Sequence, residues 1–132
     1  MTLLAPTSWG DLIDRITILE IKAERLTSPP AQANAAHELA QLRAVVAQHG
    51  DAPQGLAQLR GELAAVNRTL WDTEDAIRRK EAAKTFDAEF IALARAVYRD
   101  NDERGRIKRA ISQLLGSDII EEKQYVGYRA SE

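Results

Sequence analysis

The sequence predicts an all-α fold, a helical bundle built on one long antiparallel helical hairpin. Helix-favouring Ala, Leu, Glu, Gln and Arg dominate its 132 residues, whereas only 5% of the residues are aromatic. Apolar residues recur every three or four positions, the spacing that keeps side chains on one helix face. Turn residues divide the chain into about four helical segments and a tail. At this length we expect a single helical domain over residues 1–132.

The first predicted helix covers about residues 9–26. Ser8 stands at the N-cap position and Asp11 three positions later, which is the pattern of a capping box. A Ser-Pro-Pro run ends the helix, because proline cannot continue it. Ile18 and Ile21 fall opposite the main apolar face. A helix that is apolar on two sides is central in a bundle or packs against a partner chain.

The second predicted helix covers about residues 31–48, where leucines and valines keep a helical period. The turn residues Gly50–Pro53 end it. The third helix is expected over residues 54–80 and the fourth over residues 87–115, each roughly 40 Å long. The connection near Lys84 is short, so these two helices should be antiparallel neighbours.

The ends of the fourth predicted helix carry recognisable signals. Thr85 or Asp87 can cap its start, and Gly116 is well placed to end it. The remaining tail, residues 117–132, contains large apolar side chains without a helical period. We expect this tail to fold back over the hairpin and to be anchored there.

A polar interruption in the apolar stripes of the hairpin is the strongest functional signal. Charged groups in a packed seam reduce stability unless they are paired or serve a function. If the chain turns near Lys84, residues whose numbers sum to about 169 face each other, so Asn67 lies beside Asn101 and Arg104. Glu74 then lies beside Arg95 and Tyr98. The candidate site residues are Asn67, Trp71, Glu74, Arg78, Arg95, Tyr98, Asn101, Arg104 and Lys108.

Several sequence blocks resemble one family. They are Ser8–Lys22 (SWGDLIDRITILEIK), Asn67–Asp75 (NRTLWDTED), Phe86–Ile91 (FDAEFI), Val97–Asp102 (VYRDND), Ile107–Arg109 (IKR) and Gly116–Lys123 (GSDIIEEK). Together they are similar to a family of short bacterial helical proteins known only as a domain of unknown function. The resemblance implies a single helical bacterial domain and supplies no catalytic residue. Some members accompany sugar-transfer genes, which implies a link to surface polysaccharide synthesis.

Composition and motifs exclude most site chemistries. The chain has no cysteine and its two histidines lack a third ligand nearby, so we expect no metal and no cofactor. The segment 100–105 begins like a calcium loop, but Arg104 takes a ligand position. Carboxylates at Glu74 and Asp75 could start a magnesium site, yet Arg78 one turn later favours a Glu74–Arg78 ion pair.

Charge and hydropathy also limit the partners and the location. A net charge of -2 predicts no binding to nucleic acid or to an anionic membrane. No apolar run has membrane-spanning length, and no signal peptide is apparent, so a cytoplasmic protein is expected.

An enzyme resembling the helical chorismate mutases is the alternative function. The first helix resembles theirs through Asp14, Arg15, Lys22 and Arg25. Such chemistry needs only cations that hold a small dianion and stabilise developing charge. The cations available for this purpose, or for a nucleotide-directed site, are Arg78, Arg95, Arg104 and Lys108.

The favoured interpretation is a non-enzymatic interaction protein. An enzymatic function stays open as the less favoured alternative. Trp71 and Tyr98 could stack on a ligand, but large aromatic residues beside a helix seam are more often core residues. A buried polar set can instead fix the register and the number of associating helices. Together with the doubly apolar first helix, this predicts a homodimer or another homo-oligomer, or a surface for a protein partner.

Overall fold

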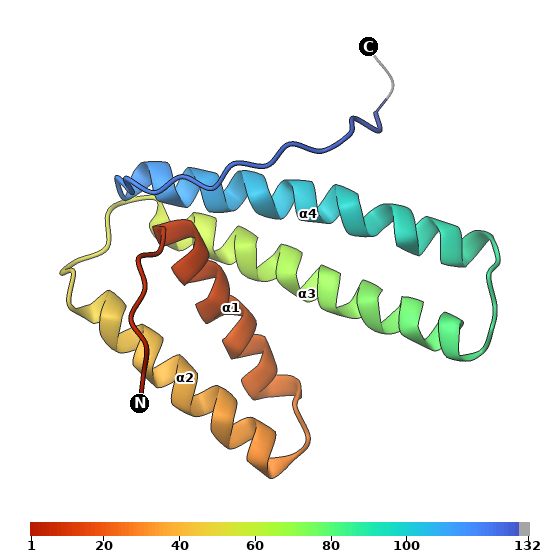
Figure 1. The fold of residues 1–132 in the computed structure, drawn as a ribbon, viewed down its shortest axis with the longest axis horizontal. Helices are drawn as coiled ribbons and strands as arrows, with labels where there is room; N and C mark the ends of the chain where they lie inside the picture. Colours follow the sequence, from red (N-terminus) through yellow and green to blue (C-terminus); the bar gives the residue numbers. More distant parts are fainter. Residues whose placement is uncertain (130–132) are drawn as a thin grey trace.

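Four helices make up the computed structural model, which describes residues 1–129. They are α1 (Trp9–Arg25), α2 (Pro29–Ala47), α3 (Leu56–Ala82) and α4 (Ala88–Leu114). No strand occurs within this described range, so the prediction of an all-α fold is confirmed. Figure 1 shows α3 and α4 as a long antiparallel hairpin, with α1 crossing one end of it. Helix α2 packs on α1 alone.

The observed boundaries of α1 and α2 follow from capping and from proline. Ser8 caps α1, because its hydroxyl accepts a hydrogen bond of 3.1 Å from the amide of Asp11. The Asp11 carboxylate does not complete the expected capping box and pairs with Lys108 instead, at 2.8 Å. Helix α2 begins at Pro29, two residues earlier than predicted, with Ser28 as its N-cap. Proline is tolerated in the first helical turn, where its missing N–H would have no partner in any case.

Hairpin helices α3 and α4 also differ from prediction by one or two residues at their ends. Helix α3 starts at Leu56 because Gly55 adopts the left-handed conformation, with φ 96°. Helix α4 is capped by Asp87, whose carboxylate accepts a hydrogen bond of 2.9 Å from the Phe90 amide. Asp87, and not Thr85, is therefore the cap.

The turn between α3 and α4 lies where the sequence placed it. Lys84 has a φ of 56°, and the Thr85 amide donates to the Lys80 carbonyl over 2.9 Å. This is the bonding of a Schellman motif, in which glycine is the usual left-handed residue. Gly116 fills the same position after α4, with φ 68°, and Ser117 donates back to the Ser112 carbonyl at 2.8 Å.

The main core lies where α1 crosses the hairpin. Ile13 and Ile16 of α1 are fully buried there, as are Leu63 of α3 and Ile111 of α4. Ile21, on the second apolar side of α1, is only 1% exposed. Helix α1 is therefore central in the bundle, because α2 covers one side of it and the hairpin covers the other.

The opposite end of the hairpin meets α1 only near Asp72 and Arg104 and the tail near Asp102, and no third helix covers it within residues 1–129. Figure 1 shows α3 and α4 continuing beyond α1 and α2 as a two-helix projection. No residue from Trp71 to Arg106 is fully buried, and we call this segment (residues 71–106) the distal arm. Phe86 and Ile91 of the arm are 56% and 55% exposed.

After α4, residues 117–129 run back along α4 without forming a helix or strand (Figure 1). Glu121 pairs with Lys108 at 3.2 Å, and the Tyr128 hydroxyl donates to Asp102 at 2.5 Å. The last three residues of the predicted tail, 130–132, lie outside the described residues. No helix in the described part of the chain combines the length and the apolar character needed to cross a membrane.

Candidate functional site

A buried ionic cluster joins α1, α3 and α4, and we call it the polar junction (Asp14, Thr17, Asn67 and Arg104). Asp14 is only 3% exposed, although it is charged. Arg104 binds it with two hydrogen bonds, from Nε at 2.9 Å and from Nη2 at 2.5 Å. This bidentate geometry is the strongest form of an arginine–carboxylate pair.

Asn67 and Thr17 complete the hydrogen bonding of the junction. Asn67 Nδ2 donates to Asp14 Oδ1 and to Thr17 Oγ1, both at 3.0 Å. The Thr17 hydroxyl donates to the Asp14 carbonyl at 2.8 Å. No buried side-chain nitrogen or oxygen within residues 1–129 is left without a hydrogen-bond partner. The junction is therefore satisfied from within the chain.

A second ionic contact lies one turn further along α4. Lys108 Nζ is 2.8 Å from Asp11 Oδ1 and 3.2 Å from Glu121 Oε2. Burial lowers the pKa of Lys108, but its hydrogen bond to Asp11 and the nearby carboxylates outweigh burial and raise the pKa overall. The hydrogen bond to Asp14 likewise raises the pKa of Arg104, against the effect of burial. Both cations remain charged, and each already faces a carboxylate.

Close approach of the helices makes these contacts possible. A Cβ atom on Gly10 would lie 2.2 Å from the Lys108 carbonyl oxygen, so only glycine fits there. The Gly10 amide donates to the Ser112 hydroxyl at 2.8 Å, and the Trp9 amide donates to the Ser117 hydroxyl at 2.9 Å. The start of α1 is thus fixed directly on the end of α4.

Sequence reasoning missed Asp14, Thr17 and the ionic role of Asp11. The signal was present, because Gly10, Asp14, Thr17 and Ile21 are spaced by four, three and four residues and are all buried. Small and polar residues on such a stripe indicate a helix face that contacts another helix closely. The cap at Ser8 is predicted correctly, whereas the partner of the Asp14 carboxylate is not.

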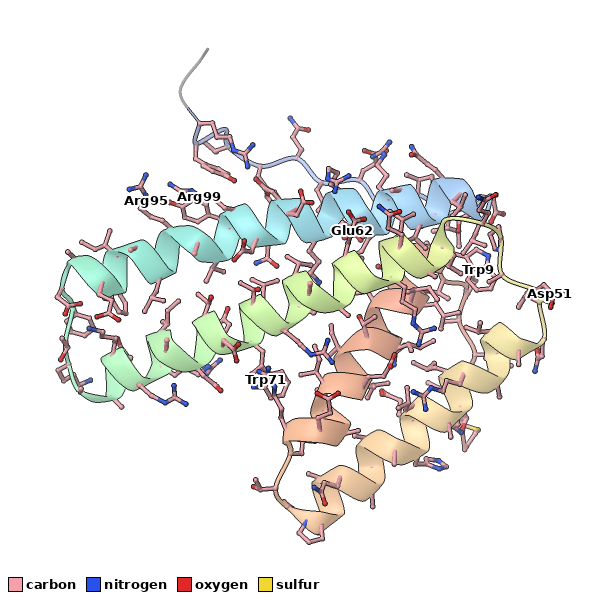
Figure 2. All side chains as sticks on the ribbon, turned by 180° about the vertical axis from the view of Figure 1, so that it is seen from behind. Trp9, Asp51, Glu62, Trp71, Arg95 and Arg99 are labelled. Carbon is pink, nitrogen blue, oxygen red and sulfur yellow. The ribbon has the colours of Figure 1, made fainter. Side chains whose placement is uncertain are left out.

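Asn67 and Arg104 of the polar junction also line an open groove of about 420 Å³ that extends along the distal arm. We call it the distal groove; it is lined by Ile18, Asn67, Leu70, Trp71, Glu74, Asp75, Arg78, Asn101 and Arg104. Figure 2 shows Trp71 beside the C-terminal end of α1. Six of the nine predicted site residues share this groove: Asn67, Trp71, Glu74, Arg78, Asn101 and Arg104.

The other three predicted residues lie elsewhere. Tyr98 and Lys108 line a separate pocket beneath the tail, and Arg95 lines neither cavity. Figure 2 shows Arg95 projecting from α4 away from α3. The structure thus does not bring Glu74 to Arg95 or Tyr98, because the latter two occupy the outer side of α4.

Two further expectations about these residues are not met. Within residues 1–129, no ion pair joins Glu74 to Arg78. Neither Trp71 nor Tyr98 is a core residue: Trp71 is half-buried and Tyr98 is 41% exposed. The reason is the missing third layer, since a two-helix arm covers only the seam between its helices.

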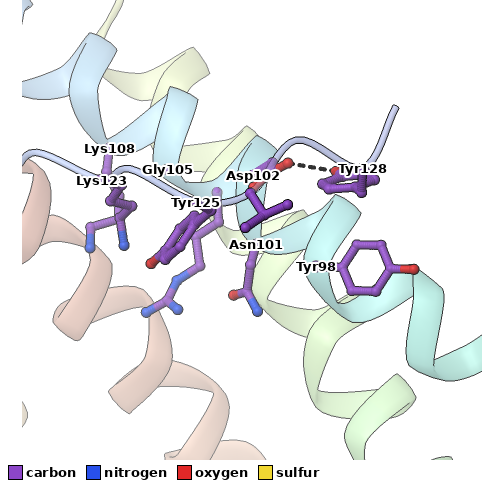
Figure 3. A pocket seen from close by; sticks show the side chains of 10 residues that line it. Tyr98, Asn101, Asp102, Gly105, Lys108, Lys123, Tyr125 and Tyr128 are labelled. Atoms are coloured by element: carbon purple, nitrogen blue, oxygen red, sulfur yellow. Dashed lines mark hydrogen bonds between the residues drawn. The ribbon is translucent and has the colours of Figure 1, made fainter. Parts of the chain in front are cut away.

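The pocket beneath the tail has a volume of about 590 Å³ (Figure 3). Tyr98, Gly105 and Tyr125 contribute to its walls, and the rings of Tyr98 and Tyr128 meet edge to face at 4.6 Å. Arg104 and Lys108 also line this pocket, but Asp14, Asp11 and Glu121 already bind their charged ends. The four cations expected to hold a dianion therefore do not form one cluster, and within residues 1–129 no group of three or more His, Asp or Glu side chains could hold a metal ion.

These features define a class of all-α protein in which a short helix pair is fixed to one end of a long hairpin by a buried ionic junction. The chain belongs to a family of unknown function, DUF6165, whose family model matches residues 4–131. The resemblance to an uncharacterised family of helical proteins is thereby confirmed. No curated protein and no solved structure matches the chain.

Proposed function

We propose that the protein is a non-enzymatic helical interaction module that forms a homodimer through the distal groove of its arm. The observation that carries the proposal is the absence of any fully buried residue from Trp71 to Arg106. A single seam between two helices leaves Ile77, Phe90 and Val97 half-buried. Isolated helical hairpins gain most of their stability from further packing, so this arm is suited to receive more helices.

The arrangement of α1 supports the groove as the contact face. At the proximal end, α1 lies on α3 and α4 and completes the core there. The distal groove continues the same face of the hairpin beyond Ile18, the α1 residue at its edge. A helix from a second copy placed in the groove would continue the layer that α1 begins.

The satisfied cations favour this proposal over the small-anion alternative. Arg104 and Lys108 are already paired with Asp14 and Asp11, so binding of an anion would have to break existing ion pairs. The polar junction then acts in specificity, because it sets the register of α1 on the hairpin and so the position at which the groove begins. We place this module in the bacterial cytoplasm, in line with the family resemblance and the lack of cysteine.

Sedimentation equilibrium over a concentration series tests the proposal. The wild-type chain should approach twice its monomer mass of 14.7 kDa as concentration rises. Trp71→Lys, which places a charge in the groove, should weaken the dimer. Ile91→Lys is the matched control, because Ile91 is exposed and lies outside the groove. Circular dichroism should show equal helicity for all three proteins, and a monomer at every concentration would refute the proposal.

A further inference from the structure

Three charged residues of the distal groove have no ion-pair partner in the part of the chain that the structure describes. Within residues 1–129, no ion pair or side-chain hydrogen bond engages Glu74, Asp75 or Arg78. Three other charges on α3 do have partners. Arg68 pairs with Glu24 at 3.2 Å, Asp72 pairs with Arg25 at 2.6 Å, and Lys80 pairs with Asp87 at 2.9 Å. Other charges on the surface are also unpaired, but Glu74, Asp75 and Arg78 are unpaired charges of both signs that line one groove.

The order of these charges along α3 is self-complementary. Acidic Glu74 and Asp75 come first, and basic Arg78 follows one turn later on the same groove face. Glu74 and Arg78 stand two residues on either side of Ala76. A second α3 running in the opposite direction, with its Ala76 at the same level, therefore presents a cation to each glutamate. Parallel pairing would instead place like charges at the same level.

We infer that two copies pair with their α3 helices antiparallel, across a two-fold axis at the level of Ala76. Each Glu74 then meets Arg78 of the partner subunit, so the contact occurs twice in the dimer, as isologous symmetry requires. Half-buried Trp71 and Ile18 supply apolar area beside the charges. This inference rests on the proposed homodimer and specifies its geometry.

The charges set the register more than the affinity. Ion pairs that remain near solvent contribute little to affinity, whereas like charges facing each other strongly disfavour a wrong alignment. A shift of one helical turn would bring Glu74 towards Asp75 of the partner subunit. Glu74 and Arg78 are therefore positioning residues for one alignment of the two copies.

A charge-swap experiment tests this geometry. Glu74→Arg alone and Arg78→Glu alone each create two like-charge contacts in a homodimer. We expect each single variant to dimerise about tenfold more weakly than the wild type. An equimolar mixture of the two variants should form a heterodimer of wild-type strength, because every contact in it again joins opposite charges. The double variant Glu74→Arg/Arg78→Glu should likewise recover as a homodimer.

Arg79→Glu is the control, because Arg79 is exposed and lies outside the groove. This substitution changes the net charge by the same amount as Arg78→Glu. It should dimerise as the wild type does. Two failures can be told apart. A monomeric wild type removes both the proposed function and this inference. A dimeric wild type whose single variants stay dimeric, or whose mixture fails to pair, removes the antiparallel geometry alone.

Discussion

At the scale of single residues, Asp14 and Arg104 determine how α1 sits on the hairpin. The side chain of Asp14 is 5% exposed and that of Arg104 is 28% exposed, so the pair is shielded from water mostly on the carboxylate side. Removing one member of a buried pair leaves an uncompensated charge, whereas replacing both with apolar groups avoids that penalty. The effects of substituting Asp14 and Arg104 on the free energy of unfolding are therefore expected to be strongly non-additive.

Substitutions at the pair test this expectation. Arg104→Met should lower the free energy of unfolding by about 3–5 kcal/mol, because it leaves the buried Asp14 carboxylate without a cation. Asp14→Asn should lower the free energy of unfolding by less, about 2 kcal/mol, because the Arg104 guanidinium can still reach water. The double variant Asp14→Leu/Arg104→Met should be more stable than Arg104→Met alone. Urea denaturation of the variants measures these values, and additive effects would show that the pair is not coupled.

Only half of this arrangement of side chains is predictable from the sequence. Arg104 interrupts the apolar stripe of the fourth predicted helix and Asn67 flanks the stripe of the third, so both are predicted. Asp14 is not, because the stripe that contains it begins with Gly10 and is short. Which carboxylate meets which cation depends on the crossing of α1 and α4, whose contacts join residues about 90 positions apart.

At the scale of helices, the start of α1 and the end of α4 approach as closely as their backbones allow. The distance of 2.2 Å from a Cβ on Gly10 to the Lys108 carbonyl leaves no room for a methyl group, and a backbone atom cannot move aside alone. The junction contacts at Asp11 and Asp14 follow on the same helix, so they depend on this approach.

Two glycine substitutions make a matched pair. Gly10→Ala should destabilise the protein by about 3 kcal/mol, because α1 must shift away from α4. Gly61→Ala, in the middle of α3, should stabilise it by about 0.5–1 kcal/mol, because open space surrounds Gly61 and alanine favours the helix. Thermal and urea unfolding of both variants give the comparison. Equal effects of the two changes would contradict the close contact.

Helix existence was predictable at this scale, and helix ends were less so. The four segments follow from apolar spacing, proline and capping residues, all of which act locally. The start of α3 differs because Gly55 takes a left-handed conformation that the sequence permits but does not require. The start of α2 differs from the prediction because Pro29 occupies the first helical turn, whereas the prediction placed it before the helix.

At the scale of the whole molecule, stability is unevenly distributed. The bundle at the crossing of α1 contains all the fully buried large side chains among residues 1–129: Ile13, Ile16, Ile21, Leu63, Ile107 and Ile111. The distal arm contains none. Local opening is easiest where few apolar contacts must be broken.

Hydrogen exchange measures this difference directly. Amides of the arm around Phe90 and Val97 should exchange faster than those around Ile13 and Ile107 at low protein concentration. If the arm is the dimer interface, its exchange should slow as concentration rises, while exchange in the bundle stays constant. Uniform slowing over the whole chain, or none in the arm, would contradict an interface confined to the arm.

The sequence by itself determined the helices, their order and the hairpin, since these depend on side-chain period and on capping within a few residues. It also placed Asn67, Asn101 and Arg104 near one another, because the hairpin turn fixes which positions of α3 and α4 are level. Only the tertiary structure decided that Asp14 of α1 neutralises Arg104, and that Glu74, Asp75 and Arg78 have no ion-pair partner among residues 1–129. The physical reason is that the crossing of α1 on the hairpin depends on close backbone contact at Gly10, which no local period encodes.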